Sequence, residues 1–226
     1  MARGGTRRRP SAGHQRRLAP VSRAFGGDRG LPIDRHYIEG FLTRHAADVA
    51  GQVLEIGDDA YTRRFGGDRV ARADILELTP VNPHATIRAD LAAADHLPDA
   101  TFDCIICTQT LQFIYDLSAA AATLHRILRP GGVLLLTVPG ISQISRYDMD
   151  RWGDYWRFTT ASVSRLLGDA FGPAWVAVAA HGNVLVAADF LRGYAAQELA
   201  PRALAYHDPD YQLLVIARAV KADEAG

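Results

Sequence analysis

Short apolar runs alternate with segments of helical periodicity along most of this 226-residue chain. Strands that alternate with helices predict a parallel sheet with helical crossovers. The run 133–138 is almost wholly apolar, as is typical of a strand covered on both faces. We therefore expect one α/β domain with helices on both faces of the sheet. The predicted strands are 53–56, 69–73, 85–89, 102–108, 133–138, 175–180 and 211–220, and the predicted helices begin near Asp34 and Ala60 or span 119–128, 160–171 and 187–199.

Composition restricts the class of protein. Hydrophobic residues make up 48% of the chain, enough for a sizeable core in one domain. We find no apolar run of about 18 residues and no signal peptide, so we expect a cytoplasmic protein without a membrane span. Cys104 and Cys107 lie three positions apart in a predicted strand, where their side chains point to opposite faces. We therefore interpret them as buried core residues, not as a redox or metal motif.

The two ends of the chain differ in charge. Residues 1–30 contain eight Arg against the single acid Asp28, a net charge of about +7 in a chain whose overall charge is zero. We interpret 1–30 as a disordered basic tail and 31–226 as the folded domain. A phosphate- or nucleic-acid-binding arm and an organelle transit peptide are the alternatives. Few aromatic residues are interleaved with the arginines, so we do not expect nucleic acid as a partner.

Polar residues and glycines follow the predicted strands at the points where the strands end. In open α/β sheets, ligands bind at the carboxyl ends of the strands. Gly57 permits a tight turn and close approach of a ligand to the backbone. Asp74, seventeen positions later, could accept hydrogen bonds from a ribose diol, and Asp90 with Leu91 could contact adenine. Each signal alone is weak, because Asp at a strand end is commonly a turn former; their order and spacing strengthen one another.

With the turn Arg129-Pro130-Gly131-Gly132, these motifs resemble the class I S-adenosylmethionine-dependent methyltransferases, in particular the small-molecule branch with the type 11 domain. The resemblance extends from about Tyr37 to Lys221. It implies a Rossmann-like, mostly parallel seven-stranded sheet that ends in an antiparallel hairpin, and S-adenosyl-L-methionine as cofactor. The implied cofactor-binding residues are Tyr37, Glu55, Gly57, Asp59, Asp74, Ile75, Asp90, Leu91, Thr108 and Gln109.

The sequence departs from the family pattern in two places. The family's loop reads Gly-x-Gly-x-Gly, whereas here Asp59 occupies the middle glycine position. Asp59 could hold the cofactor's ammonium group, with Arg63 or Arg64 pairing with its carboxylate; a solvated helix face is the alternative for both arginines. Many relatives carry Glu-His where this chain has Gln112-Phe113, so no general base is obvious there.

The acceptor side is marked by residues 145–158, in which aromatic and charged side chains are interleaved without helical or strand period. Placed after the fifth strand, this segment would cover the mouth of the pocket and suit a polar ring such as a sugar. The alternative is a helix-capping loop packed by Trp152 and Trp156. The candidate general bases are His181, Asp150 and His207, with His36 and Asp148 as further possibilities.

The expected function is therefore O-methylation of a small hydroxylated metabolite, for example a sugar or a glycosylated natural product, without a metal. Two alternatives remain. A nicotinamide-dependent oxidoreductase would also use a strand, a glycine loop and an acid, but it would keep more glycines. A catalytically inactive methyltransferase-fold protein that serves as a binding module would explain the lost glycines. The acceptor, the methylated atom and the oligomeric state are not determined by the sequence.

Overall fold

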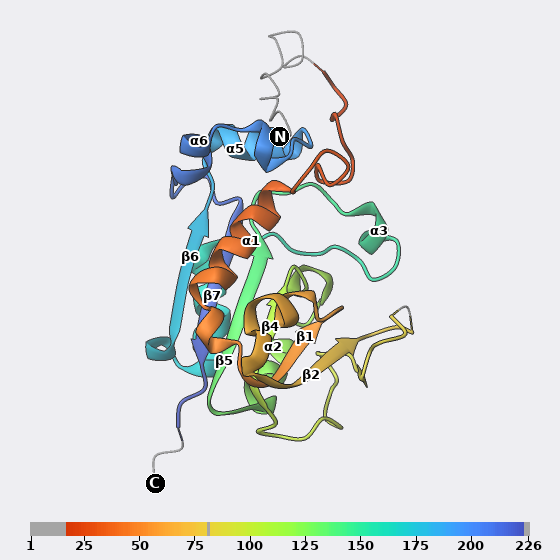
Figure 1. Ribbon diagram of the computed structural model, residues 1–226, viewed down its shortest axis with the longest axis vertical. Coiled ribbons are helices and arrows are strands. Elements are labelled where there is room, and N and C mark those ends of the chain that lie inside the picture. Colours follow the sequence, from red (N-terminus) through yellow and green to blue (C-terminus); the bar gives the residue numbers. More distant parts are fainter. Residues whose placement is uncertain (1–16, 81, 224–226) are drawn as a thin grey trace.

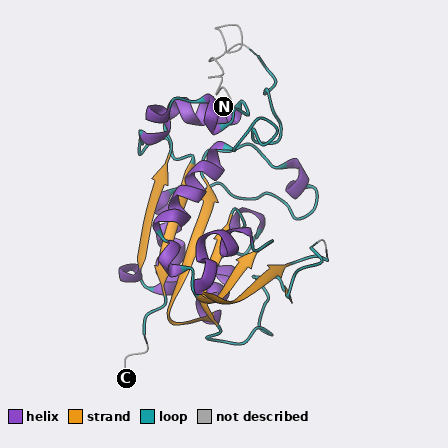
Figure 2. Ribbon diagram, in the orientation of Figure 1, coloured by secondary structure: helices purple, strands orange, loops and turns teal. Residues whose placement is uncertain are grey.

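The computed structural model describes residues 17–80 and 82–223, which form one seven-stranded sheet between helices (Figures 1 and 2). The strand order is β3-β2-β1-β4-β5-β7-β6. β7 runs antiparallel to β5 and to β6, and the other pairs are parallel. The predicted mostly parallel sheet with an antiparallel hairpin is confirmed. The strands are β1 (Gly51–Ile56), β2 (Val70–Glu77), β3 (Ile87–Arg88), β4 (Phe102–Thr108), β5 (Leu128–Pro139), β6 (Val176–His181) and β7 (Leu214–Val220).

Helices cover both faces of the sheet. α1 and α5 contribute to an apolar cluster on one face, and α2 and α4 contribute to the cluster on the other. Figure 1 shows α1 crossing the sheet in front of β7 and β5, with α5 and α6 beyond the carboxyl end of β6. The helices are α1 (Ile33–Arg44), α2 (Leu117–Ile127), α3 (Arg146–Met149), α4 (Thr160–Phe171), α5 (Val184–Leu191) and α6 (Pro201–Ala205), and the short helical turns are η2 (Ala46–Asp48), η3 (Thr62–Gly66), η4 (Gly67–Arg69), η5 (Leu111–Phe113), η6 (Pro173–Trp175) and η7 (Ala196–Glu198).

The centre of the sheet is apolar on both sides, because β4 and β5 lie between the two helical layers. Cys104 belongs to the cluster beneath α1, whereas Cys107 belongs to the cluster beneath α2 and α4. Both thiols are free and buried, and burial raises their pKa, that of Cys107 to about 12. The interpretation of the two cysteines as core residues on opposite faces is confirmed.

Three predicted element ends are wrong. The turn 129–132 does not stop the preceding helix; it belongs to the irregular first part of β5, after α2 has ended at Ile127. The helix predicted over 187–199 ends at Leu191 and is followed by the separate turn η7. The strand predicted over 69–73 continues to Glu77, because Ile75 and Leu76 extend its buried, β-branched and apolar run. This last change alters the functional site.

The segment before α1 packs against the domain. The Phe25 ring lies 5.9 Å from that of Phe190 in α5, and Arg29 Nε donates to Glu198 Oε2 at 2.9 Å. The folded region therefore extends N-terminally from the predicted boundary at residue 31. The rest of the predicted basic tail, residues 1–16, lies outside the described residues.

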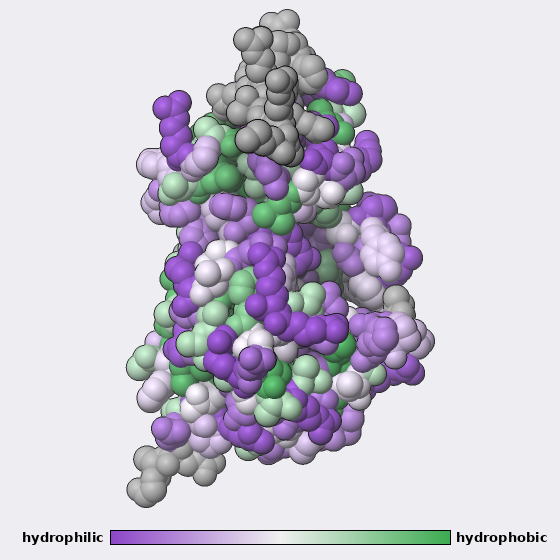
Figure 3. Space-filling model, viewed as in Figure 1, coloured by the Kyte–Doolittle hydropathy of each residue, from purple (hydrophilic) through white to green (hydrophobic). Residues whose placement is uncertain are grey.

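Within the described ranges, none of the helices has both the length and the apolar character needed to cross a membrane. The face shown in Figure 3 mixes hydrophilic and hydrophobic residues, with hydrophilic ones predominating along its centre.

Candidate functional site

A cavity of about 220 Å³ lies at the carboxyl ends of β1, β2 and β4. Its floor comes from residues at or just after the strand ends, and its roof comes from η5 and the loop after α3. Such a position at the edge of a parallel sheet is where ligands of open α/β folds bind. The lining residues are Ile56, Gly57, Leu76, Glu77, Leu78, Ala89, Asp90, Leu91, Thr108, Gln109, Thr110, Phe113, Ile114 and Trp152.

Gly57 forms the turn that opens this cavity. Its φ of +92° lies in the region that favours glycine, and a Cβ added there would meet no protein atom within 4 Å. Its N–H donates to Leu76 O at 2.9 Å, and its carbonyl accepts from Asn82 Nδ2 at 2.7 Å. The backbone of Gly57 is therefore held on both sides, while its open side leaves space in which a ligand fits.

Glu55 supports the loop from below instead of lining the cavity. The side chain is 2% exposed, and its two carboxylate oxygens accept from the backbone N–H groups of Tyr61 and Thr62 at 3.2 and 2.7 Å. Burial raises the pKa of Glu55 to about 7, although these hydrogen bonds act in the opposite direction. The predicted site residue Glu55 is thus a positioning residue for the loop that follows Gly57.

The departure at Asp59 does not obstruct the cavity. The Asp59 carboxylate pairs with Arg63, one helical turn later. Arg64 Nη1 pairs with Glu39 of α1 at 2.8 Å. The side chains of Arg63 and Arg64 are 74% and 56% exposed, so both lie on the solvated face given as the alternative. None of these three residues lines the cavity, so the role of Asp59 in holding the cofactor stays a prediction.

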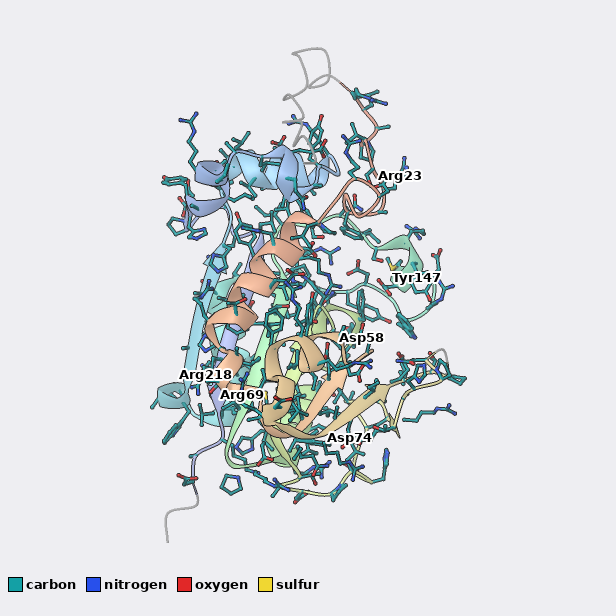
Figure 4. The ribbon with its side chains drawn as sticks, in the orientation of Figure 1. Arg23, Asp58, Arg69, Asp74, Tyr147 and Arg218 are labelled. Atoms are coloured by element: carbon teal, nitrogen blue, oxygen red, sulfur yellow. The ribbon has the colours of Figure 1, made fainter. Side chains whose placement is uncertain are left out.

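Asp74 is the main correction to the predicted site. It lies inside β2, opposite Leu54, and is 1% exposed. Its carboxylate accepts from Thr86 Oγ1 at 2.9 Å, from Arg72 at 2.9 Å and from Gln52 Nε2 at 3.1 Å. Figure 4 shows Asp74 back along β2, away from Asp58 in the loop after β1. Asp74 is therefore a structural group of the strand, and the buried neighbour Ile75 does not line the cavity either.

Glu77 occupies the position that the sequence analysis assigned to Asp74. Leu76 pairs with Ile56, so Glu77 begins the cavity wall beside Gly57. Its Oε1 accepts from the Leu78 N–H at 3.2 Å. The separation of twenty positions from Gly57 matches the spacing expected for an acid that binds ribose hydroxyls. The signal for Glu77 was present in the apolar pair Ile75-Leu76, which carries the strand beyond Asp74.

The remaining floor residues are those predicted. The cavity brings together Asp90 and Leu91 after β3 with Thr108 and Gln109 after β4. Asp90 Oδ1 accepts from the Ala92 N–H at 2.9 Å, while the residue itself is exposed. Gln109 has a φ of +49°, which is unusual for a residue with a side chain, and its N–H donates to Thr137 O at 2.8 Å. Backbone strain of this kind is concentrated at functional sites.

A second cavity of about 390 Å³ adjoins the first, because Gln109 and Phe113 line both. It lies among the segment before α1, the first turn of α1, η5, and the segment 142–157. Its lining combines charged and polar groups with aromatic and aliphatic ones. Its remaining lining residues are Ala24, Phe25, Pro32, Asp34, Arg35, Gln112, Pro139, Ser142, Gln143, Ser145, Asp148, Asp154, Arg157, Phe190 and Leu213.

The segment 145–158 covers both cavities. Trp152 closes the first cavity and lies 6.3 Å from the Phe113 ring. Asp148, Asp154 and Arg157 line the second. Trp156 Nε1 donates to Ile114 O at 3.1 Å, which fastens the segment to the loop after β4. Figure 4 shows Tyr147 on α3, outward from the sheet. The segment is therefore fastened by its tryptophans and also forms walls of the cavities.

The structure does not bring His181, His207 or Asp150 to either of these cavities, whereas Asp148, named as a further possibility, lines the second. His181 and His207 line a third cavity of about 840 Å³, with Tyr37 and Arg44 of α1. His181 stacks on Tyr37, and His181 Nδ1 lies 3.1 Å from His207 Nε2. Burial, together with the nearby charges of His207 and Arg44, lowers the pKa of His181 to about 4. His181 lies away from the first cavity because β6, which carries it, is the edge strand farthest from β1 and β2.

Two other predicted site residues, Tyr37 and Asp150, also lie outside the first two cavities. Tyr37 is buried, and its hydroxyl donates to Leu204 O at 2.9 Å, so it supports the fold away from the first cavity. The Asp150 side chain is 58% exposed and pairs with Arg146 at 2.9 Å on the surface of α3. Neither residue is available to a ligand in the first two cavities. Within residues 17–80 and 82–223, no three His, Cys, Asp or Glu side chains are grouped so that they could hold a metal.

The sheet order, the terminal antiparallel strand and the cavity beside Gly57 define the class I methyltransferase fold. The comparisons agree: residues 39–136 match a family described as a methyltransferase domain. Together with the fold, this match supports a class I S-adenosylmethionine-dependent methyltransferase, a family whose cofactor is S-adenosyl-L-methionine.

Individual relatives are distant. Malonyl-[acyl-carrier protein] O-methyltransferase of Serratia marcescens is 30% identical over 148 residues, which cover 60% of this chain and 55% of that protein. A probable S-adenosylmethionine-dependent methyltransferase of Mycolicibacterium smegmatis is 32% identical over 101 residues, 45% of this chain and 35% of that protein. The chain thus spans about half the length of the first relative and about a third of the second.

Among solved structures, the N-methyltransferase NodS of Bradyrhizobium japonicum, in complex with S-adenosylhomocysteine, superposes with a TM-score of 0.54 and 16% identity. The match covers 92% of this chain and 94% of that one. Similarity at this level shows the fold alone.

Proposed function

We propose that this protein is an S-adenosylmethionine-dependent methyltransferase that methylates an oxygen atom of a small hydroxylated molecule. The observation that carries the proposal is the pair of adjoining cavities that share Gln109 and Phe113. Methyl transfer needs the donor and the acceptor to lie end to end, and two cavities with a common wall provide this arrangement. The relative from Serratia, named as an O-methyltransferase, supports the choice of oxygen.

The first cavity fits the nucleoside part of the cofactor. Glu77 would accept from the ribose hydroxyls, because its carboxylate is at the strand end and forms no ion pair with any residue that the structure describes. Leu78 and Leu91 would flank the adenine ring, and Asp90 would accept from its amino group. The open side of Gly57 would face the methionine part. Bound there, the cofactor would supply an electrophilic methyl group on a sulfonium.

Arg35 is the side chain of this chain best placed to pair with the cofactor's carboxylate. It lies on the first turn of α1, and its Nη1 donates to the hydroxyl of Tyr61 in the loop after Gly57, at 2.9 Å. Burial lowers the pKa of Arg35, but the charges of Tyr61, Asp34 and Asp58 outweigh burial and raise it. Arg35 lines the second cavity beside Gln109, where the methionine end would lie. It takes the role that the sequence analysis gave to Arg63 or Arg64.

The second cavity would hold the acceptor. Its volume of about 390 Å³ suits one small polar molecule, and its mixture of charged groups with Phe25, Phe113 and Phe190 suits a hydroxylated ring such as a sugar or a glycosylated natural product. Methyl transfer requires little more of the protein than orientation, exclusion of water and removal of a proton. The walls of this cavity provide groups for each of these tasks.

The test is calorimetric titration of the purified protein with S-adenosylhomocysteine, and with NAD as a control. Micromolar or tighter binding of S-adenosylhomocysteine, with no binding of NAD, supports the proposal. No binding to folded protein contradicts it.

A second titration tests the role of Arg35 and uses 5′-methylthioadenosine, which lacks the amino acid part. Arg35→Met should weaken the binding of S-adenosylhomocysteine about tenfold or more and leave the affinity for methylthioadenosine unchanged. The control Arg63→Met should leave both affinities unchanged.

A transfer assay distinguishes the proposed enzyme from the alternative, a binding module without turnover. The altered glycine loop motivated this alternative, yet Asp59 is held by Arg63 and leaves the space beside Gly57 open. Transfer of the radiolabelled methyl group of S-adenosylmethionine to any hydroxylated acceptor excludes a purely binding role. Tight binding of S-adenosylhomocysteine, with no transfer to a wide acceptor panel, favours that role.

A further inference from the structure

The lining of the second cavity contains a buried amide with an unused acceptor. Gln112 is 4% exposed, and its Nε2 donates to Gln109 Oε1 at 3.2 Å. Its carbonyl oxygen Oε1 is buried and has no hydrogen-bond partner among the described residues. A buried carbonyl without a donor is unfavourable, so it calls for an explanation in a native structure. A ligand in the second cavity that donates a hydrogen bond would provide the missing partner.

The same cavity contains a carboxylate that no side chain holds. Asp34 lies in the first turn of α1 and is partly buried. Its Oδ1 accepts from the Arg35 backbone N–H at 2.8 Å, and within the described ranges no side chain donates to it. The helix predicted to begin near Asp34 begins at Ile33, with Pro32 in the cap position and no side-chain cap. The carboxylate is therefore free to accept a hydrogen bond from a ligand.

The other carboxylates of this cavity are already engaged. Asp154 forms a bidentate pair with Arg157, and its Oδ2 also accepts from the Ser145 N–H at 3.0 Å. Asp148 Oδ2 accepts from Ser145 Oγ at 2.5 Å. Protonation of Asp154 would weaken its pair with Arg157, and protonation of Asp148 would make it a weaker acceptor for Ser145 Oγ. Asp34 differs from both, because it can gain a proton without losing a side-chain partner.

Burial makes Asp34 a stronger base than an exposed aspartate. Burial raises its pKa, and the opposing effects of the Arg35 charge and of the backbone hydrogen bonds are smaller. The charged groups that share the cavity with it are Arg35 on α1 and Asp148, Asp154 and Arg157 on the covering segment. A base with a pKa closer to the working pH removes a hydroxyl proton more effectively.

We propose that Asp34 is the general base and that Gln112 Oε1 is a second hydrogen-bond acceptor, so that the methyl acceptor is a molecule carrying at least two hydroxyl groups. This assignment rests on the proposed function and adds to it the substrate class and the base. The reacting hydroxyl oxygen forms the new O–CH₃ bond while the bond from that methyl to the sulfonium sulfur of S-adenosylmethionine breaks. The sulfur keeps the electron pair, and the hydroxyl proton passes to Asp34.

The first experiment measures binding without turnover. Protein saturated with S-adenosylhomocysteine is examined by ligand-observed NMR with catechol, D-glucose and D-glucuronate, and with their fully O-methylated counterparts, which have lost the hydroxyl donors. We expect at least one hydroxylated probe to bind and its methylated counterpart to bind at least tenfold more weakly. Gln112→Leu should weaken the hydroxylated probe at least tenfold. Equal binding of both members of every pair overturns the proposal, as does the absence of binding by every hydroxylated probe.

The second experiment measures transfer of the radiolabelled methyl group to the probe that binds. Asp34→Asn should lower kcat at least 100-fold, while the affinity for S-adenosylhomocysteine stays within about threefold of wild type. Asp150→Asn, which removes an exposed carboxylate of the covering segment, is the matched control and should keep the wild-type rate. The wild-type rate should rise with pH through the pKa of Asp34, and this step should be missing in Asp34→Asn.

Three results overturn the assignment. Asp34→Asn that turns over like wild type excludes Asp34 as the base. Transfer to an amine probe such as ethanolamine, with none to the hydroxylated probes, excludes the substrate class. No transfer to a hydroxylated probe that binds excludes the catalytic arrangement. Each of these three results counts only when calorimetry has shown tight binding of S-adenosylhomocysteine. Failure of the proposed function is a different outcome, in which S-adenosylhomocysteine does not bind.

Discussion

The backbone N–H of Gly57 donates to the carbonyl oxygen of Leu76 at 2.9 Å, and this bond ties the end of β1 to the end of β2. It places Glu77, the next residue, beside the turn that Gly57 makes. Asp74 lies three residues earlier and is held by Thr86, Arg72 and Gln52. The two acids of β2 therefore have separate roles: Glu77 faces the ligand cavity, and Asp74 stabilises the strand.

Substitution of the two acids should separate these roles. Glu77→Ala should weaken binding of S-adenosylhomocysteine about 10- to 100-fold, the effect of losing a charged acceptor worth about 1–3 kcal/mol. Asp74→Ala should leave that affinity within about twofold, but lower the free energy of unfolding by about 1–3 kcal/mol, because it leaves buried donors without a partner. Calorimetry and urea unfolding of both variants measure the two effects. Loss of cofactor affinity in a folded Asp74→Ala variant would contradict the assignment.

Gly57 and Gly67 form a matched pair for testing the cavity. Both have positive φ, +92° and +54°, and a Cβ at either position would meet no protein atom within 4 Å. Alanine at either position should therefore lower the free energy of unfolding by about 1 kcal/mol through backbone strain alone. Only Gly57→Ala places a methyl group at the cavity, so only this variant should lose affinity for S-adenosylhomocysteine, by tenfold or more. Equal affinities of the two variants would remove Gly57 from the ligand site.

Trp152 offers an optical signal for ligand binding. It lines the first cavity, whereas Trp175 is 47% exposed in η6 and lines neither of the first two cavities. Addition of S-adenosylhomocysteine should change the tryptophan fluorescence excited at about 295 nm, because the ligand would contact the Trp152 ring. Trp152→Phe should lose most of this change, and Trp175→Phe should keep it. Retention of the full change in Trp152→Phe would show that the ring does not contact the ligand.

Much of the sheet could be predicted from the sequence, because its signals are local. The apolar runs that became β4 and β5 and the helical periodicity of α1 and α4 each specify one element, and their alternation specifies the parallel order. Gly57, Asp90, Leu91, Thr108 and Gln109 follow from the rule that strand ends meet at one edge. Five of the ten predicted cofactor-binding positions thus line one cavity.

The errors have a different origin. The predicted strand stops at Asp74, since Asp is a frequent turn former. In the structure, Thr86 and Gln52 donate hydrogen bonds to the Asp74 carboxylate, so this acid is satisfied inside β2. His181 and His207 were chosen for their chemistry, and the sequence does not reveal that β6 is the distant edge strand. The sequence does not point to Asp34 and Gln112 together, because only the tertiary structure brings both to one cavity.

Glu55 should make the stability of the protein depend on pH. Its folded-state pKa of about 7 lies above the ordinary value of 4.5. A carboxyl with a raised pKa binds its proton more tightly in the folded state, so the stabilisation is fully present below about pH 4.5 and is lost as pH rises through about 7. The shift corresponds to about 3 kcal/mol for a side chain that is 2% exposed. Other groups, including His181 with its lowered pKa, contribute their own dependence.

The comparison with Glu55→Gln isolates this contribution, because glutamine does not titrate. Urea unfolding at pH 5.0 and pH 8.5 should show a free energy of unfolding that falls with pH more steeply in wild type than in the variant. Glutamine has one oxygen where Glu55 uses two to accept from the Tyr61 and Thr62 N–H groups, so the variant is less stable at every pH. The quantity to compare is therefore the slope of the free energy of unfolding against pH in each protein. Parallel pH profiles for the two proteins would show that Glu55 remains ionised across the range, and its buried charge would then be stabilised by the loop that it holds.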